Sequence, residues 1–280
     1  MCRWLAYSGS PLPLENLVST PANSLIHQSR ESALGATALN ADGFGVGWYA
    51  PADPVPALFR SVQPAWADTN LGELARHVRS PLFLAHVRAT TGTPVQQTNC
   101  HPFRHEGWLW CHNGAVRDFA RVKRDLVLAI DPQLFPCIVG STDSEVLFHL
   151  ALTFGLREDP VSAVETMIDH VEQVGRAHGV EQPLQMTVAT TDGTRLWAFR
   201  HSSERASRSL FYSTDVATLR LLHPEVPGLR EVSEETRLVV SEPLFDLSGA
   251  WVEVPESSYV IVEDGQDEIG ALAASRGGRL

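Results

Sequence analysis

The chain of 280 residues begins Met1-Cys2, and a cysteine in the second position can become the first residue of a processed chain. Methionine aminopeptidases remove Met1 when the second residue is small, as cysteine is. The exposed residue then carries a thiol and a free α-amine with an ordinary pKa of about 7.7–8.0. That amine can take the thiol proton near neutral pH, so the residue is a nucleophile with its own general base. The alternative is that Cys2 plays no part in any reaction. Only the other motifs decide between these two interpretations.

Three further segments hold polar residues whose chemistry is complementary to a charged substrate. Arg88 ends the apolar segment 82–88, and its planar guanidinium suits a carboxylate. Asn113 and Gly114 offer a side-chain NH₂ and a backbone N–H, the donors of an oxyanion hole. Asp143 opens a predicted helix and can present its carboxylate to an ammonium group. Each also has an ordinary explanation: a surface ion pair, a hairpin turn at Asn-Gly and a favourable helix-dipole interaction, respectively.

Taken together, these residues describe recognition of a γ-glutamyl group. Such a group has an α-carboxylate, an α-ammonium and an electrophilic side-chain amide carbon. Arg88, Asp143 and Cys2 match these features one to one, and Asn113 with Gly114 covers the developing oxyanion. The sequence therefore predicts a cysteine-dependent hydrolase of γ-glutamyl amides that passes through a glutamyl thioester.

The chain resembles the class II glutamine amidotransferases, which belong to the superfamily of N-terminal-nucleophile hydrolases. Seven motifs carry the resemblance: Met1-Cys2-Arg3, NADGFGV (40–46), FLAHVRA (83–89), TNCHPF (98–103), HNG (112–114), GSTDSE (140–145) and SEPL (241–244). Within the family, they are similar to fungal subunits that cleave glutathione at its γ-glutamyl bond. The Met-Cys-Arg start and the Asn-Ala-Asp-Gly motif are also shared with the γ-glutamyl amidohydrolases of ergothioneine biosynthesis.

The resemblance implies both a fold and a set of roles. The fold is α+β, a four-layer αββα sandwich with two antiparallel sheets. The roles fall on six residues: the nucleophile Cys2, the oxyanion hole Asn113 and Gly114, and the substrate-binding residues Arg88, Thr91 and Asp143. One departure is Asn40, which stands where many family members have an arginine ahead of the Asp-x-x-Gly turn.

The hydrophobic pattern by itself predicts an α+β protein, because strands are followed by helices and then by strands again. Strands are predicted at 2–8, 40–49, 57–62, 82–88, 108–112, 184–191, 194–201, 209–213, 237–241 and 258–263. Helices are predicted at 70–79, 117–130, 142–154 and from 159 to about 179, the third with Thr142 and Glu145 in a capping pattern. Without an internal repeat or linker, we expect one domain over residues 2–270 and a flexible tail over 271–280.

Composition narrows the classes of partner. The net charge of −11 provides no basic surface for nucleic acid or anionic lipid, and no apolar run approaches the ~20 residues of a membrane span. Four cysteines without a disulfide pattern predict a reducing compartment, the cytoplasm. The Cys and His residues between 100 and 112 fit no standard zinc spacing, so we expect no metal and no other cofactor. His101 and His112 are instead expected to brace loops around the oxyanion hole.

The expected partner is a small γ-glutamyl substrate, with a peptidase or synthase subunit as a possible protein partner. Two other functions remain open from the sequence. One is a glutaminase subunit that passes ammonia to a separate synthase. The other is a non-catalytic regulatory subunit that only binds a γ-glutamyl compound. The leaving group can be ammonia, cysteinylglycine or a thiol adduct.

Overall fold

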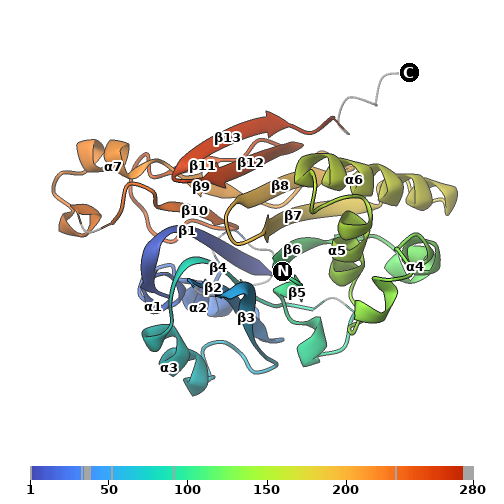
Figure 1. Cartoon of the computed structure of the whole chain (residues 1–280), viewed down its shortest axis with the longest axis horizontal. Helices are drawn as coiled ribbons and strands as arrows, with labels where there is room; N and C mark the ends of the chain where they lie inside the picture. The colour runs from blue at the N-terminus through green and yellow to red at the C-terminus, as the bar shows by residue number, and fades with distance from the viewer. Residues whose placement is uncertain are drawn as a thin grey trace.

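Two antiparallel sheets lie face to face, with helices on the outer face of each (Figure 1). The computed structural model describes residues 2–32, 34, 39–51, 53–90, 92–230 and 232–273. Within these residues, the first sheet has the strand order β11 (Trp251–Glu253), β9 (Phe211–Ser213), β10 (Arg237–Val240), β1 (Arg3–Pro13), β4 (Arg79–Val87), β2 (Phe44–Ala50) and β3 (Asp53–Ser61). The second has the order β13 (Gln266–Ala271), β12 (Ser258–Glu263), β8 (Leu196–Ser202), β7 (Leu184–Thr191), β6 (Trp108–Val116) and β5 (Phe103–His105).

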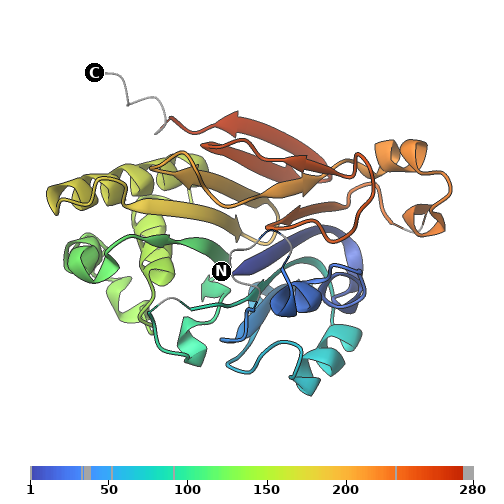
Figure 2. The same ribbon diagram turned by 180° about the vertical axis from the view of Figure 1, so that it is seen from behind.

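The helices form the two outer layers, as the view from behind also shows (Figure 2). The first sheet is covered by α1 (Glu15–Val18), α2 (Leu25–Arg30) and α3 (Thr69–His77). The second is covered by α4 (Phe119–Leu128), α5 (Asp143–Thr153) and α6 (Pro160–Ala177). The remaining helical segments are α7 (Val216–Leu222) and three short 3₁₀ turns, η1 (Gln97–Asn99), η2 (Phe135–Cys137) and η3 (Pro227–Arg230). The predicted four-layer αββα sandwich is confirmed.

Three apolar clusters fill the three spaces between the layers. Side chains alternate along a strand, so Leu5 and Tyr7 of β1 pack toward α1–α3, whereas Trp4 and Ala6 pack toward the second sheet. The same alternation decides which polar residues point between the sheets.

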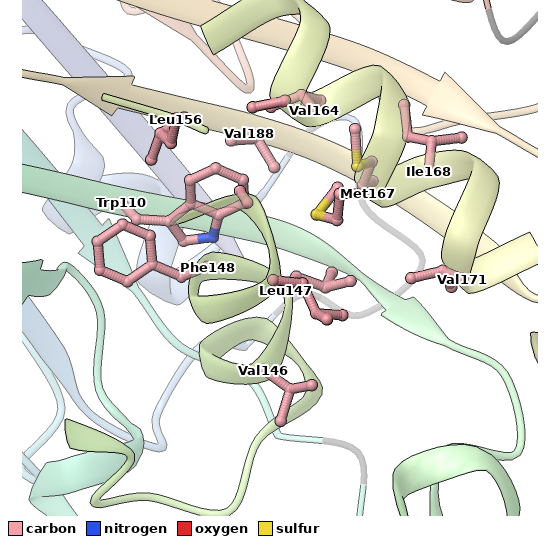
Figure 3. Packing of buried hydrophobic residues seen from close by; sticks show 14 of the residues in the cluster. Trp110, Val146, Leu147, Phe148, Leu156, Val164, Met167, Ile168, Val171 and Val188 are labelled. Atoms are coloured by element: carbon pink, nitrogen blue, oxygen red, sulfur yellow. The ribbon is translucent and has the colours of Figure 1, made fainter. Parts of the chain in front are cut away.

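The apolar cluster between the second sheet and α4–α6 fixes the position of α5 (Figure 3). Phe148 of α5 stacks on Trp110 of β6 with ring centroids 5.6 Å apart, and Val164 and Met167 of α6 pack on the other side. The helix is apolar almost all round because it is buried on nearly every side. Half of the predicted capping box is confirmed, since the Thr142 hydroxyl accepts a hydrogen bond from the Glu145 N–H at 3.2 Å. The Glu145 carboxylate instead accepts from the Val139 and Gly140 N–H groups of the preceding loop. The first turn of α5 is therefore held rigidly.

The Gly-rich strand β2 passes close to other parts of the chain, as its period-two glycines predict. A Cβ at Gly45 would lie 2.2 Å from the His101 carbonyl oxygen, and one at Gly47 would lie 2.9 Å from a Leu109 methyl group. These approaches leave no room for a side chain.

Several strand predictions were wrong at their ends: β2 begins at Phe44 and not at 40, and β6 continues to Val116 and does not end at 112. β1 does not stop at Gly9 but continues to Pro13, with its register against β4 shifting between Ser8 and Leu12. β3 begins at Asp53 and not at 57, so it includes part of a proline-rich stretch. Because β3 is the edge strand of its sheet, a proline there removes no obligatory ladder bond. Of the predicted tail, residues 274–280 lie outside the described residues. No described helix is long and apolar enough to cross a bilayer.

Candidate active site

Cys2 and Arg88 lie side by side at the end of two neighbouring strands. Arg3 pairs with Val87 across β1 and β4, which makes Cys2 and Arg88 the next residues beyond that pair. By strand alternation, Cys2 shares the inward face of Trp4, so it points into the space between the sheets. Arg88 also lowers the pKa of the Cys2 thiol, which agrees with this closeness.

Asn113 reaches the same space from the second sheet. It shares a face of β6 with Cys111, which packs between the sheets. A hydrogen-bond chain ties it to the first sheet: the Trp4 indole N–H donates to the Thr187 hydroxyl at 3.2 Å, and that hydroxyl donates to the Asn113 carbonyl at 3.4 Å. The Asn113 Nδ2 is buried and has no partner among the described residues. A buried amide donor without an acceptor is available to a ligand.

Gly114 lies inside β6, so Asn-Gly does not form a turn and the hairpin alternative is wrong. A Cβ at Gly114 would lie 1.9 Å from the Gln185 carbonyl oxygen of β7. The strand can therefore keep its pairing with β7 only with glycine here.

Asp143 approaches from the helical layer, in the first turn of α5. Its Oδ2 accepts from the Val116 N–H at 2.7 Å, and its Oδ1 accepts from the Ser144 N–H at 2.8 Å. It raises the pKa of the Cys2 thiol, as a nearby negative charge must. The end of β6 and the start of α5 thus hold the half-buried carboxylate beside the thiol.

Arg88 is only 3% exposed, and it is not the surface ion pair that the ordinary explanation required. Its guanidinium donates to the Thr93 hydroxyl at 2.7 Å, the Thr90 hydroxyl at 3.2 Å and the Asp42 carbonyl at 3.4 Å. All three acceptors are neutral, and Arg88 forms no ion pair with a carboxylate in the described part of the chain. A buried guanidinium normally has an anionic partner.

The Cys2 thiol needs a base. Burial raises its pKa above the ordinary value, and a hydrogen bond from Sγ to the Ala89 carbonyl (3.5 Å) and the charge of Arg88 only partly oppose this. At neutral pH the sulfur is therefore protonated and weakly nucleophilic.

Three neutral histidines lie around these residues. His86 and His101 stack with ring centroids 4.2 Å apart, and burial lowers the pKa of His86 to about 3 and that of His101 well below its ordinary value. Burial also lowers the pKa of His112, whose Nδ1 lies 2.7 Å from the Ser144 hydroxyl. Among the described residues, no group of three or more His, Cys, Asp or Glu side chains is placed to hold a metal ion.

The structure thus brings predicted residues together: Arg88 and Asp143 both act electrostatically on Cys2, and Asn113 with Gly114 lies on β6, which contacts β1. Thr91, the remaining predicted residue, lies outside the described residues.

Sequence reasoning missed the residues that hold these groups. Asp42 accepts from the Thr90 N–H at 2.8 Å, and its own N–H donates to the Arg88 carbonyl at 3.0 Å. Asn99 accepts from the Ser141 N–H at 2.8 Å and so fastens the TNCHPF segment to the loop before α5. Asp42 lies in the NADGFGV motif and Asn99 in the TNCHPF motif. Membership of these motifs was the only sequence signal for their roles.

Comparison with known proteins places the chain in a family. The family model for class II glutamine amidotransferases matches residues 20–276. The chain belongs to that family. This confirms the predicted resemblance and the prediction of an enzyme that acts on carbon–nitrogen amide bonds.

Curated relatives cover almost the whole chain. The probable glutamine amidotransferase DUG3 of Saccharomyces cerevisiae is 32% identical over 293 aligned residues, which cover 94% of this chain and 82% of that protein. The gamma-glutamyl-hercynylcysteine sulfoxide hydrolase of Mycobacterium tuberculosis is 29% identical over the full length of both.

Solved structures support the fold. A glutamine aminotransferase class-II domain protein from Silicibacter pomeroyi is 33% identical and superposes with a TM-score of 0.72, covering 97% of this chain and all of that one. Glutamine phosphoribosylpyrophosphate amidotransferase from B. subtilis, at 17% identity, superposes with a TM-score of 0.64 over 97% of this chain and 49% of its own. The latter likeness concerns the fold alone.

Proposed function

We propose that this enzyme hydrolyses γ-glutamyl amide bonds, with Cys2 as its nucleophile once Met1 has been removed. The observation that carries the proposal is the buried Arg88 guanidinium, which lies beside the Cys2 thiol and has only neutral partners among the described residues. A substrate α-carboxylate would supply the missing negative charge.

The glutamyl head group would lie between two opposite charges. Arg88 would bind the α-carboxylate and Asp143 the α-ammonium, with Thr91 as a further contact. Asp143 is suited to this role because its Oδ2 accepts only from the Val116 N–H among the described residues, which leaves a lone pair for the ammonium, while Ser144 donates twice to Oδ1 and fixes the carboxylate. This pairing places the side-chain amide carbon next to Cys2.

The reaction would then proceed by acyl transfer. The α-amine of Cys2 takes the thiol proton, and the thiolate attacks the amide carbon. Asn113 Nδ2 and the Gly114 N–H stabilise the oxyanion. The carbon–nitrogen bond breaks as the α-ammonium returns its proton to the leaving amine. Water, deprotonated by the same amine, then hydrolyses the thioester and releases glutamate.

For the substrate we favour a γ-glutamyl thiol or peptide, such as glutathione, over free glutamine. The support is the likeness over the full length of both chains to a gamma-glutamyl-hercynylcysteine sulfoxide hydrolase, and over 94% of this chain and 82% of the relative to DUG3. Selectivity would come from the loop at 93–97 and the C-terminal strands, because the head-group contacts are common to all these substrates. The four free cysteines support a cytoplasmic location.

The deciding experiment is competition kinetics with purified, Met1-free protein against glutamine, glutathione and larger γ-glutamyl compounds. We expect the highest kcat/KM for a γ-glutamyl thiol or peptide. A much higher value for glutamine would favour a glutaminase subunit that feeds a synthase. Binding without turnover of any substrate would favour a regulatory subunit. Cys137→Ala is the matched control for changes at Cys2, since Cys137 is an exposed free cysteine.

A further inference from the structure

The side chain of Arg3 turns back to the residue before it. Its Nη1 donates to the Cys2 carbonyl oxygen at 2.8 Å, and its Nε donates to Glu242 Oε2 at 3.0 Å. Both side chains of the ion pair are almost fully buried, at 3% and 1% exposure. The guanidinium thus bridges the first residue of the site and a carboxylate at the end of β10.

Glu242 is itself held firmly. It accepts from Asn23 Nδ2 at 3.0 Å, from the Ser32 hydroxyl at 2.8 Å and from the Leu34 N–H at 3.3 Å. A carboxylate with this many donors has one preferred orientation, so it can orient the planar guanidinium in turn.

Ser241, the residue before Glu242, also fixes the start of β1. The Trp4 N–H donates to the Ser241 hydroxyl at 3.1 Å, and the Ser241 N–H donates to the Trp4 carbonyl at 3.0 Å. Two consecutive residues of the SEPL motif therefore hold the start of β1, although they lie near the other end of the sequence.

This arrangement matters most for a processed chain. Once Met1 is gone, Cys2 is a terminal residue, and terminal residues fray unless they are tied down. A fixed Cys2 carbonyl fixes the peptide plane between Cys2 and Arg3, and with it the position of the Cys2 Cα from which both the α-amine and the thiol project. Stability alone explains the pair poorly, because a buried ion pair adds little net stability.

We infer that Arg3 and Glu242 are positioning residues, which hold the Cys2 carbonyl and thereby aim its amine and thiol at the substrate. The inference rests on the proposed function of Cys2. It assigns a role in catalysis to the SEPL motif, 239 residues from Arg3.

Arg3→Lys tests the inference, and β10 supplies a matched control. Arg237 makes the same two contacts far from Cys2: its Nη1 donates to the preceding Thr236 carbonyl at 2.9 Å, and its Nε donates to Asp267 at 3.3 Å. A lysine keeps the charge in either place but cannot hold two acceptors in a planar fork.

We expect Arg3→Lys to lower kcat by about 10- to 100-fold, as small misplacements of reacting groups do. KM should change less than about threefold, because Arg88 and Asp143 are untouched. Arg237→Lys should leave kcat within about twofold of the wild-type value, whatever its effect on Tm. An unchanged kcat for Arg3→Lys, or an equal loss for Arg237→Lys, overturns the inference.

Glu242→Gln gives an independent readout if Arg3→Lys folds poorly. The substitution leaves the positive charge of Arg3 uncompensated next to the α-amine, which favours the unprotonated amine. The acidic limb of the kcat/KM–pH profile should therefore move to lower pH, and kcat should fall. A purely structural role predicts wild-type kcat and an unmoved limb in the folded fraction, and that result overturns the inference.

The wild-type enzyme separates this test from that of the proposed function. If the Met1-free protein shows no Cys2-dependent turnover, the proposed function fails and the inference falls with it. If Cys2-dependent turnover is present and both variants match the wild type, only the inference fails.

Discussion

Two buried arginines border the same cysteine and differ in what they contact. Arg3 points toward the helical layer and pairs with Glu242, whereas the partners of Arg88 within the described part of the chain are all hydroxyl or carbonyl oxygens. The desolvation cost of burying a guanidinium is similar in both places. The protein compensates the first charge with its own carboxylate and leaves the second uncompensated. That difference identifies Arg3 as part of the framework and Arg88 as a group kept for a ligand.

The strongest test of this division removes the nucleophile between the two arginines. Cys2→Ala should abolish amide hydrolysis without unfolding the protein, because Cys2 is only partly buried and outside the apolar clusters. Turnover measured with γ-glutamyl substrates, with Cys137→Ala alongside, checks this. A loss of only severalfold would remove Cys2 from the nucleophile role.

Retaining Met1, behind an uncleavable tag, should inactivate the enzyme almost as completely. The acylated nitrogen cannot accept the thiol proton, and burial keeps the pKa of the thiol above its ordinary value. Alkylation of Cys2 in the tagged protein should therefore accelerate steadily as the pH rises above neutral. A tagged protein with full activity would contradict the α-amine as base.

Asn113→Ala should lower kcat by about 10²- to 10³-fold, the usual effect of deleting one oxyanion-hole donor, with little change in KM. Its unpartnered Nδ2 is the reason to expect no folding penalty from a lost hydrogen bond. Steady-state kinetics and a thermal melt decide the matter. A defect confined to KM would instead make Asn113 a substrate-binding residue.

Arg88→Ala and Asp143→Asn should each lower kcat/KM by about 10- to 150-fold, since one charged hydrogen bond contributes about 1.5–3 kcal/mol. The same factor should apply to glutamine, glutathione and larger γ-glutamyl compounds, because the lost contact belongs to the shared half of the substrate. A loss that differs strongly between substrates would place these residues at the leaving group.

Much of the fold could be predicted from local patterns. β7 and β12 have the predicted bounds, because each apolar run is bordered by turn residues. β11 and β13 were missed, since β11 has only three residues, β13 is largely exposed and polar, and the pairing of both comes from neighbouring strands. Local propensity also favoured a turn at Asn113, and pairing of β6 with β7 overrode it.

The site could be predicted only in part, for a related reason. Arg88 and Asp143 belong to short motifs whose chemistry is evident from the residue types. The contact between Arg3 and Glu242 joins residues 239 positions apart, and no local pattern specifies such a partner. Whether a buried arginine has a carboxylate partner is a property of the fold, and it is what separates the two arginines.

The buried histidines differ from the two arginines, because burial keeps them uncharged. Because burial depresses the pKa of His86 to about 3, the unfolded chain binds more protons than the folded one between that value and about 6.5. Stability is therefore lost as the pH falls below about 6.5, and His86 alone should account for about 2 kcal/mol by pH 5. Urea unfolding of the wild type and His86→Phe at pH 7 and pH 5 measures this. An equal loss in both proteins would contradict the assignment.

The smallest expected effect tests the two arginines directly, without any substrate. Arg88→Met removes a buried charge that forms no ion pair with a carboxylate of the described residues, and the Thr90 and Thr93 hydroxyls can still bond to each other at 2.9 Å. The free energy of unfolding should therefore rise by about 1 kcal/mol, as happens when a site kept for function is filled with an apolar side chain. Arg3→Met should instead lower it by about 3 kcal/mol, because the Glu242 carboxylate stays buried without its partner. The urea midpoints of both variants at pH 7 show whether each substitution raises or lowers the free energy of unfolding. If Arg88→Met destabilises the protein as much as Arg3→Met, the charge of Arg88 is compensated within the protein. Arg88 is then not the residue that binds the substrate carboxylate.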